Sequence, residues 1–146
     1  MVWLPCPHYN PDLDTDNPPR TVLTLRHAVG RADGLLICSP EYARGVAGVM
    51  KNGLDWLVAS PEFPGKPVAV INASPRATHA DAALRLTLAT MSARLIEHAS
   101  IALPLLGRNL DAEAIAADRD LSSLMRQALE GMTYFLSAPT RKSENH

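Results

Sequence analysis

Two short runs of apolar residues constrain the fold of this chain more than any other feature of its sequence. The first run, Gly34 to Ser39, lies between Asp33 and Pro40, and the second is Pro67 to Asn72. Continuous apolar runs of this length are typical of parallel strands that are buried on both faces. We therefore expect both runs to be central strands of a parallel sheet, with a weaker third strand at Ser100 to Leu103.

Segments with apolar residues at helical spacing separate these runs. We expect helices from about Thr21 to Arg31, Val46 to Val58, Asp81 to Ile96 and Leu121 to Leu136, the last one capped by Asp120. The alternation of helices and strands predicts an α/β fold with a parallel sheet. The predicted organisation is one domain over residues 1–138, which starts with an extended, proline-rich loop over residues 1–20. A polar and disordered tail is predicted at residues 139–146.

Composition and charge favour an ordinary globular protein. Nearly half of the 146 residues are apolar, and the formal net charge is −1. Such a chain has no broad electrostatic attraction for nucleic acid or an acidic membrane surface. No apolar run approaches the ~20 residues that cross a bilayer, and we identify no signal peptide. Because Cys6 and Cys38 form no CxxC pattern, we expect a cytoplasmic protein with free thiols and no metal site.

The predicted parallel sheet selects two loops as candidate ligand sites. In sheets of this kind, ligands bind beyond the carboxyl ends of the strands. The loop after the first predicted strand is Ser39 to Gly45, here called loop one. The loop after the second is Asn72 to Ala80, here called loop two.

Loop one has features that suit a flat heteroaromatic ring. Pro40 ends the strand sharply, and Gly45 permits unusual dihedral angles before the helix expected from Val46. The free N–H groups at the start of a helix suit an electron-rich or anionic ligand, and Tyr42 offers an apolar face with a polar tip. These features also fit a plain strand-to-helix connection with a surface tyrosine. Arg44 fits either a phosphate contact or a surface charge.

Loop two is rich in small and hydroxyl-bearing residues. It could form hydrogen bonds with the edge of a ligand or bring Arg76 near a phosphate. An ordinary polar crossover loop with a solvated His79 fits the same residues. Other site chemistry is not indicated, because the chain contains no HExxH, GxSxG, GxGxxG or GxxxxGK[ST] motif.

The segment SPEYARGVAGVMKNGLDW, from Ser39 to Trp56, resembles the NADPH-dependent FMN reductase family, in which a PEY loop is followed by a KN-x-(L/I)-DW helix. The loop Tyr9 to Asp14, the turn Gly65 to Val68 and the turn Asn72 to Arg76 match the family in the same order. The resemblance covers the chain from about Tyr9 to Leu136. It implies a flavodoxin-like, three-layer α/β/α fold, non-covalently held FMN, and hydride transfer from NADPH or NADH.

The resemblance also implies roles for particular residues. The PEY loop would line the isoalloxazine ring of FMN, and Ser74 with its neighbours would close the other side. Because the chemistry belongs to the flavin, no side chain is predicted to act as an acid or base. The helix after the loop commonly takes part in dimerisation in this family, so we interpret its motif residues as helix packing and dimer contacts. The predicted cofactor-binding residues are Pro40, Glu41, Tyr42, Ala43, Arg44, Gly45, Asn72, Ser74 and Arg76.

Two departures from the family pattern stand out. Many members have Asn-Gly after PEY, where this chain has Ala43-Arg44. The family normally begins with a strand, a phosphate-binding loop, a helix and a second strand, and none of these precedes Tyr9 here. An N-terminally truncated fold would leave Gly34 to Ser39 as an exposed apolar edge and FMN without its phosphate cradle. Omitted residues, a truncated gene product and a covering partner chain would each explain this.

The function that the sequence predicts is NAD(P)H-dependent reduction of FMN by a homodimer or homotetramer. A quinone or azo reductase of the same family would use the same flavin site. A different class of protein, a non-catalytic flavodoxin-like domain that oligomerises without FMN, would fit the absent phosphate loop.

Overall fold

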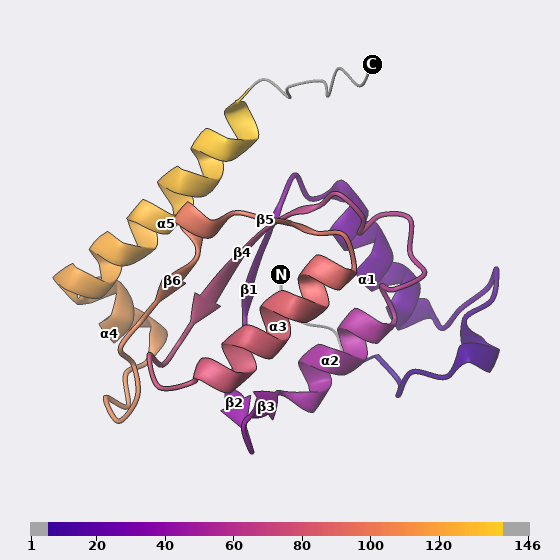
Figure 1. Ribbon diagram of the computed structural model, residues 1–146, viewed down its shortest axis with the longest axis horizontal. Helices are drawn as coiled ribbons and strands as arrows, with labels where there is room; N and C mark the ends of the chain where they lie inside the picture. Colours follow the sequence, from indigo (N-terminus) through magenta and orange to yellow (C-terminus); the bar gives the residue numbers. More distant parts are fainter. Residues whose placement is uncertain (1–5, 139–146) are drawn as a thin grey trace.

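The computed structural model describes residues 6–138 of the chain (Figure 1). The first five residues and the predicted tail at 139–146 lie outside this range. The elements are η1 (Pro11–Leu13), α1 (Arg20–Arg31), β1 (Leu35–Cys38), β2 (Glu41–Tyr42), β3 (Gly45–Val46), α2 (Gly48–Asp55), β4 (Pro67–Asn72), α3 (Thr78–Thr90), β5 (Arg94–Leu95), η2 (Glu97–Ala99), β6 (Ile101–Ala102), α4 (Ala112–Ala117) and α5 (Arg119–Ser137).

The main sheet is parallel and is organised around β4. Strand β1 pairs with β4 in a register that runs from Leu35–Val68 to Cys38–Ile71. On its other side, β4 pairs with β5 at its beginning and with β6 at its end. The predicted α/β class with a parallel sheet is therefore confirmed.

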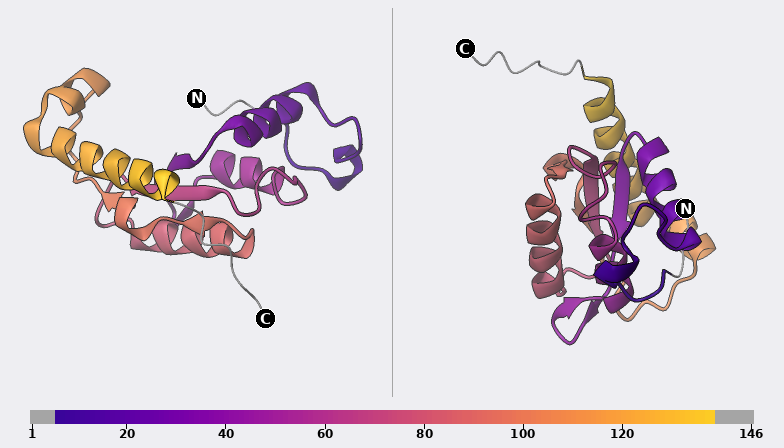
Figure 2. Two further views of the ribbon diagram at one scale, coloured as in Figure 1. Left: turned by 90° about the horizontal axis from the view of Figure 1, so that it is seen from above. Right: turned by 90° about the vertical axis from the view of Figure 1, so that its right-hand side faces the viewer.

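Helices α3 and α5 cover opposite faces of this sheet (Figure 2). The alternation of side chains along β4 explains the division, because successive residues point to opposite faces. Val68 and Val70 pack in one cluster with Leu84 and Leu88 of α3. Ala69 and Ile71 belong to two smaller clusters that include residues of α5.

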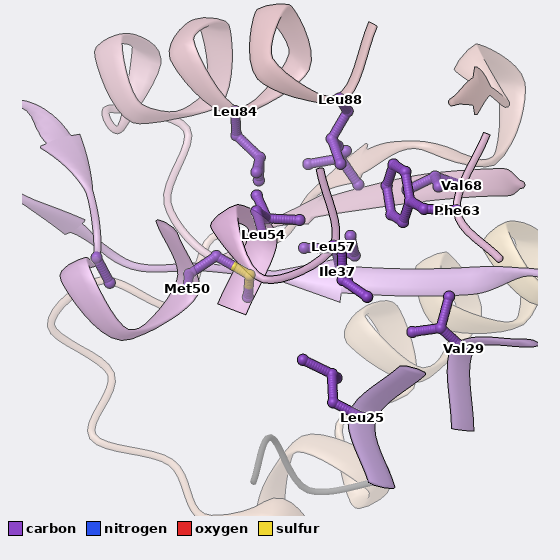
Figure 3. Close-up of a cluster of buried hydrophobic side chains, with 12 residues drawn as sticks. Leu25, Val29, Ile37, Met50, Leu54, Leu57, Phe63, Val68, Leu84 and Leu88 are labelled. Atoms are coloured by element: carbon purple, nitrogen blue, oxygen red, sulfur yellow. The ribbon is translucent and has the colours of Figure 1, made fainter. Parts of the chain in front are cut away.

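The largest core cluster joins α1, α2 and α3 to the sheet (Figure 3). Leu25 and Val29 of α1 and Leu54 of α2 are at most 2% exposed. Leu25 and Val29 lie four residues apart, which is the helical spacing that predicts α1 from the sequence. Phe63, in the loop before β4, fills the same cluster and is fully buried. This core fixes the ends of β1 and β4, where the candidate loops begin.

Strand β1 is less buried than its sequence predicts. Within residues 6–138 it pairs with β4 alone, so it lies at an edge of the described sheet. Leu36 is 40% exposed and Cys38 is also exposed, on the sheet face that α5 covers over β4. The expectation of burial on both faces is correct for β4 and wrong for β1.

Several element boundaries differ from the predicted ones: α3 begins at Thr78 rather than Asp81, and α2 ends at Asp55 rather than Val58. The helix predicted over Asp81 to Ile96 ends at Thr90 as α3, because Ser92 adopts a φ of 63° and the Ala93 N–H returns to the Leu88 carbonyl at 2.9 Å. That left-handed residue stops the helix and frees the chain for β5, which the periodicity did not reveal.

Two further differences concern the starts of α2 and α5. Val46 belongs to β3, and α2 begins at Gly48. Asp118, not Asp120, caps α5, and its carboxylate accepts hydrogen bonds from the N–H groups of Asp120 and Leu121. The short helix α4 just before it was not predicted.

Candidate functional site

A pocket of about 620 Å³ lies at the carboxyl ends of β1, β4 and β6. This is the position that the topology of a parallel sheet favours for a ligand. The pocket contains six of the nine predicted cofactor-binding residues, and Ala43, Arg44 and Gly45 do not line it. The lining residues are Ser39, Pro40, Glu41, Tyr42, Asn72, Ala73, Ser74, Arg76, Ala77, Leu105, Leu106, Gly107 and Asn109.

Loop one forms a small β-hairpin, which corrects the expected strand-to-helix connection. Strands β2 and β3 pair antiparallel, with Tyr42 opposite Gly45. The two turn residues, Ala43 and Arg44, have φ angles of 50° and 60°. Positive φ at both central residues is the requirement of a type I′ hairpin turn. The hairpin separates the pocket from α2, so the N-terminal N–H groups of α2 are not part of the pocket lining.

Glu41 connects the hairpin to the beginning of α3. Its Oε2 accepts a hydrogen bond of 2.9 Å from the N–H of Ala80, which lies 39 residues later in the chain. The N-cap residue of α3, Ala77, has no side chain that can accept such a bond. A carboxylate at this place satisfies a free N–H and interacts favourably with the helix dipole. Loop one and loop two therefore meet through Glu41.

Asn72 braces loop two from within. Its Oδ1 accepts from the N–H of Ser74 at 3.0 Å, and its Nδ2 donates to the carbonyl of Ala77 at 3.2 Å. The Ser74 hydroxyl in turn accepts from the N–H of Arg76 at 3.3 Å. These side chains shape the backbone of the loop, and Arg76 is the one cation among the lining residues.

A third loop, from Leu105 to Asn109, completes the pocket and was not predicted. It follows β6 and is joined to β4 and loop two by backbone hydrogen bonds, from Leu103 N–H to Asn72 at 2.7 Å and from Leu105 N–H to Ala73 at 3.3 Å. Gly107 and Asn109 have φ angles of 76° and 48°. The signal was present in the sequence, because a Gly and an Asn follow the third predicted strand at its carboxyl end.

The motif residues on α2 serve a different purpose from the pocket. Asn52 accepts from the Tyr9 N–H at 2.8 Å and donates to the Pro7 carbonyl at 3.0 Å. Trp56 is fully buried, donates from its indole to the same Pro7 carbonyl at 2.8 Å, and meets the Tyr9 ring edge-on. Two residues of the KN…DW motif, Asn52 and Trp56, therefore hold the N-terminal loop against α2.

Arg26 of α1 strengthens the attachment of the same loop. It bridges to Asp14 at 2.7 Å and donates to the Trp56 carbonyl, with both charged side chains nearly buried. The interpretation of the α2 motif as helix packing is thus too narrow, because its polar atoms bind the backbone of a distant segment. Its role in dimer contacts stays a prediction.

The described residues contain no cluster suited to a metal ion. No three His, Cys, Asp or Glu side chains come together within residues 6–138. Over the same range, no helix has the length and apolarity needed to cross a bilayer.

Comparison with known proteins shows the family to which this chain belongs. The family model described as NADPH-dependent FMN reductase matches residues 3–105. An NAD(P)H-dependent FMN reductase of Pseudomonas aeruginosa is 31% identical over 131 residues, which are 86% of this chain and 71% of the relative. A quinone reductase of Pseudomonas putida is 40% identical over 76 residues, 49% of this chain and 40% of the relative.

A solved structure extends the agreement to three dimensions. The flavoenzyme FerB, an NAD(P)H:(acceptor) oxidoreductase from Paracoccus denitrificans, superposes with a TM-score of 0.71 and 27% identity, over 88% of this chain and 76% of FerB. The matched family segment runs from the N-terminal loop that α2 holds to the first residue of the third pocket loop. This chain belongs to the NADPH-dependent FMN reductase family and is an oxidoreductase of that type.

Proposed function

We propose that this chain binds FMN in the pocket formed by its three loops and uses NAD(P)H to reduce a small acceptor. The observation that carries the proposal is the pocket itself, because it gathers Tyr42, Ser74 and Arg76 at the carboxyl edge of the sheet. Its volume of about 620 Å³ lies within the range of typical cofactor sites. The family and the relative from Pseudomonas aeruginosa carry FMN reductase in their names, which supports the choice of cofactor.

The residues of the pocket fit the parts of FMN. Tyr42 offers a flat face, and Leu105 and Leu106 of the third loop supply apolar surface among the other walls. The backbone of loop two presents polar groups to a ring edge. Arg76 would pair with the phosphate or with an anionic nicotinamide nucleotide. When bound, FMN would supply hydride acceptance and donation, and the protein would supply orientation and exclusion of water.

A quinone is the acceptor that a second observation favours. The quinone reductase of Pseudomonas putida shares 40% identity over 76 residues with this chain. Leu106 is 62% exposed and Tyr42 is 68% exposed, so two of the residues that line the pocket carry exposed apolar surface. Such surface suits a flat, weakly polar ring better than a charged acceptor.

A homodimer or homotetramer is part of the proposal. Val58 and Leu86 are 62% and 70% exposed and border a hollow of about 460 Å³ beside α2 and α3. Exposed apolar side chains gathered at one place commonly mark a protein interface.

The test is a calorimetric titration of the full chain with FMN, followed by NAD(P)H oxidation with a quinone or with free FMN as acceptor. We expect saturable FMN binding, and we expect Tyr42→Ala to weaken it roughly tenfold, as the loss of one aromatic stacking contact does. Tyr134→Ala is the matched control, because Tyr134 is 75% exposed on α5 and does not line the pocket. Absence of FMN binding in excess ligand would contradict the proposal and favour the non-catalytic alternative.

A further inference from the structure

We propose that Glu41 is a positioning residue, whose carboxylate ties the β2–β3 hairpin to the start of α3 and so sets the separation between Tyr42 and loop two. The consequence for FMN rests on the proposed function. The tether itself is a property of the folded chain and can be tested without any ligand. It assigns Glu41 a role different from the direct cofactor contact that the family resemblance implies.

The geometry of the contact supports a structural tether. The hydrogen bond from the Ala80 N–H to Glu41 Oε2 is 2.9 Å long and partly buried. Ala80 is the third residue of α3, which is the position that an N-cap side chain normally satisfies. Ala77, at the N-cap, cannot do so, and the distant Glu41 takes its place. Because the acceptor is charged, this bond is stronger than a neutral one.

The pairing of its own strands fixes the hairpin only weakly, and Val46 at the end of β3 is the residue of the hairpin that packs against the core cluster. Its two strands have two residues each and form a sheet separate from the main one. An isolated two-stranded hairpin is marginally stable in water. The turn at Ala43 and Arg44 is also strained, since both residues have positive φ. Pairing within the hairpin therefore does not by itself hold Tyr42 over the pocket.

The neighbouring acid on α3, Asp81, engages one of its two oxygens elsewhere, and its other oxygen, Oδ1, is buried with no partner among the described residues. Asp81 pairs through Oδ2 with the Nε of Arg85 at 2.8 Å, and Arg85 also bridges to Glu97. Asp81 is therefore directed along its own helix. Glu41, arriving from the hairpin, reaches the free N–H at the helix start.

The experiment compares Glu41→Ala and Glu41→Gln with the wild type. The glutamine variant keeps an oxygen that can accept the Ala80 bond, whereas alanine removes it. Glu130→Ala is the control for loss of one carboxylate, because Glu130 is exposed on α5, outside the pocket. The readouts are amide hydrogen exchange at Ala80 and in the hairpin without ligand, and the Kd for FMN from calorimetry.

In the protein without ligand, we expect Glu41→Ala to accelerate exchange at Ala80 about tenfold or more, while Glu41→Gln and Glu130→Ala stay near the wild type. We expect the Kd for FMN to rise about tenfold in Glu41→Ala and to be largely restored in Glu41→Gln. This paired loss and rescue is the result expected for a tether.

Three results would overturn the inference. Unchanged exchange at Ala80 in Glu41→Ala would show that the tether is absent. An unchanged Kd despite faster exchange would show that the tether does not set the pocket. Weak FMN binding in Glu41→Gln with Ala80 still protected would assign Glu41 to the cofactor itself. If the wild type binds no FMN, the proposed function fails. Hydrogen exchange at Ala80 in the protein without ligand then still shows whether Glu41 forms the tether.

Discussion

Ala43 and Arg44 adopt the least favourable backbone conformation near the candidate site. Their φ angles of 50° and 60° lie in the left-handed region, which costs a residue with a Cβ atom about 1 kcal/mol or more. A type I′ turn requires this conformation and favours Asn-Gly, which is the pair that many members of the family carry. The chain therefore keeps the hairpin geometry with residues that are poorly suited to it.

The strain predicts that Ala43→Gly stabilises the protein by about 1 kcal/mol, because glycine adopts positive φ without a Cβ clash. The same chemical change at Ala83, an exposed position inside α3, is expected to destabilise by about 1 kcal/mol. Thermal and denaturant unfolding of the two variants measures both effects. If glycine stabilised the protein at both positions, or destabilised it at both, the assignment of Ala43 to a type I′ turn would be contradicted.

At the scale of the element, α2 acts as an anchor for a segment far from it in sequence. Asn52 of α2 and Trp56, the residue at its C-terminal cap, lie one turn apart and bind the backbone of residues 7–9. Lys51 and Asp55 lie beside them and form an ion pair of 2.5 Å with each other on the surface. The four motif positions therefore divide into two that hold the N-terminal loop and two that face solvent.

This division predicts a clear difference between two alanine variants of the same helix. Asn52→Ala removes three hydrogen bonds to the loop, which we expect to cost about 1–2 kcal/mol of unfolding free energy and to accelerate hydrogen exchange over residues 6–14. Lys51→Ala removes an exposed ion pair and is expected to cost less than about 0.5 kcal/mol. Exchange mass spectrometry and urea titration test this pair, and similar losses in both variants would refute it.

Helix α5 depends on a charged cap. The Leu121 N–H donates to Asp118 at 3.0 Å, and Arg108 bridges to the other carboxylate oxygen at 2.5 Å. The hydrogen bond from the Leu121 backbone N–H, followed by the one from the Arg108 guanidinium, lowers the pKa of the Asp118 carboxyl below its ordinary value of 3.8. Because both favour the ionised form, the folded state binds a proton at Asp118 less readily than the unfolded state.

The sign of the effect on stability follows from that difference. The contribution of Asp118 to folding stability is fully present above the ordinary pKa of its carboxyl. It is lost as the pH falls through the lower pKa of the folded state. We expect Asp118→Asn to show a weaker loss of stability below about pH 4 than the wild type, since the amide still caps but does not titrate. Unfolding free energies over a pH series, with Glu130→Gln as control, measure this. An acid dependence as steep in Asp118→Asn as in the wild type would rule it out.

At the scale of the whole molecule, the described sheet has an open side. Strand β1 pairs with β4 alone within residues 6–138, and Leu36 is 40% exposed there. An apolar hollow of about 340 Å³ between α1, β1 and α2 lies at the same edge. Exposed edge strands without charges are templates for further pairing.

The open edge predicts association that depends on protein concentration. Leu36→Lys places a charge on β1 and is expected to shift the chain toward smaller species in analytical ultracentrifugation. Leu13→Lys is the control, since Leu13 is similarly exposed at 44% but lies in the N-terminal loop. A sedimentation profile that Leu36→Lys leaves unchanged would show that this edge does not drive association.

Local pattern determined most of the elements of this protein and one part of its site. Apolar runs specified β4 and most of β1, helical stripes specified α1 and the core faces of α2, α3 and α5, and the carboxyl-end rule selected loops one and two. These features depend on the order of side chains along short segments, which periodicity records directly. The PEY and KN…DW residues likewise identified the family.

Contacts between distant segments decided the rest. The cap from Glu41 to Ala80, the third wall at Leu105 to Asn109 and the anchoring of the N-terminal loop by Asn52 each join residues that the sequence keeps far apart. Strand β5 has only two residues, which is too short for a periodic pattern in the sequence. It forms because β4 provides a strand with which it can pair. Residue pattern therefore specified which segments fold, and only the packing of those segments specified which side chains face the pocket and which hold its walls.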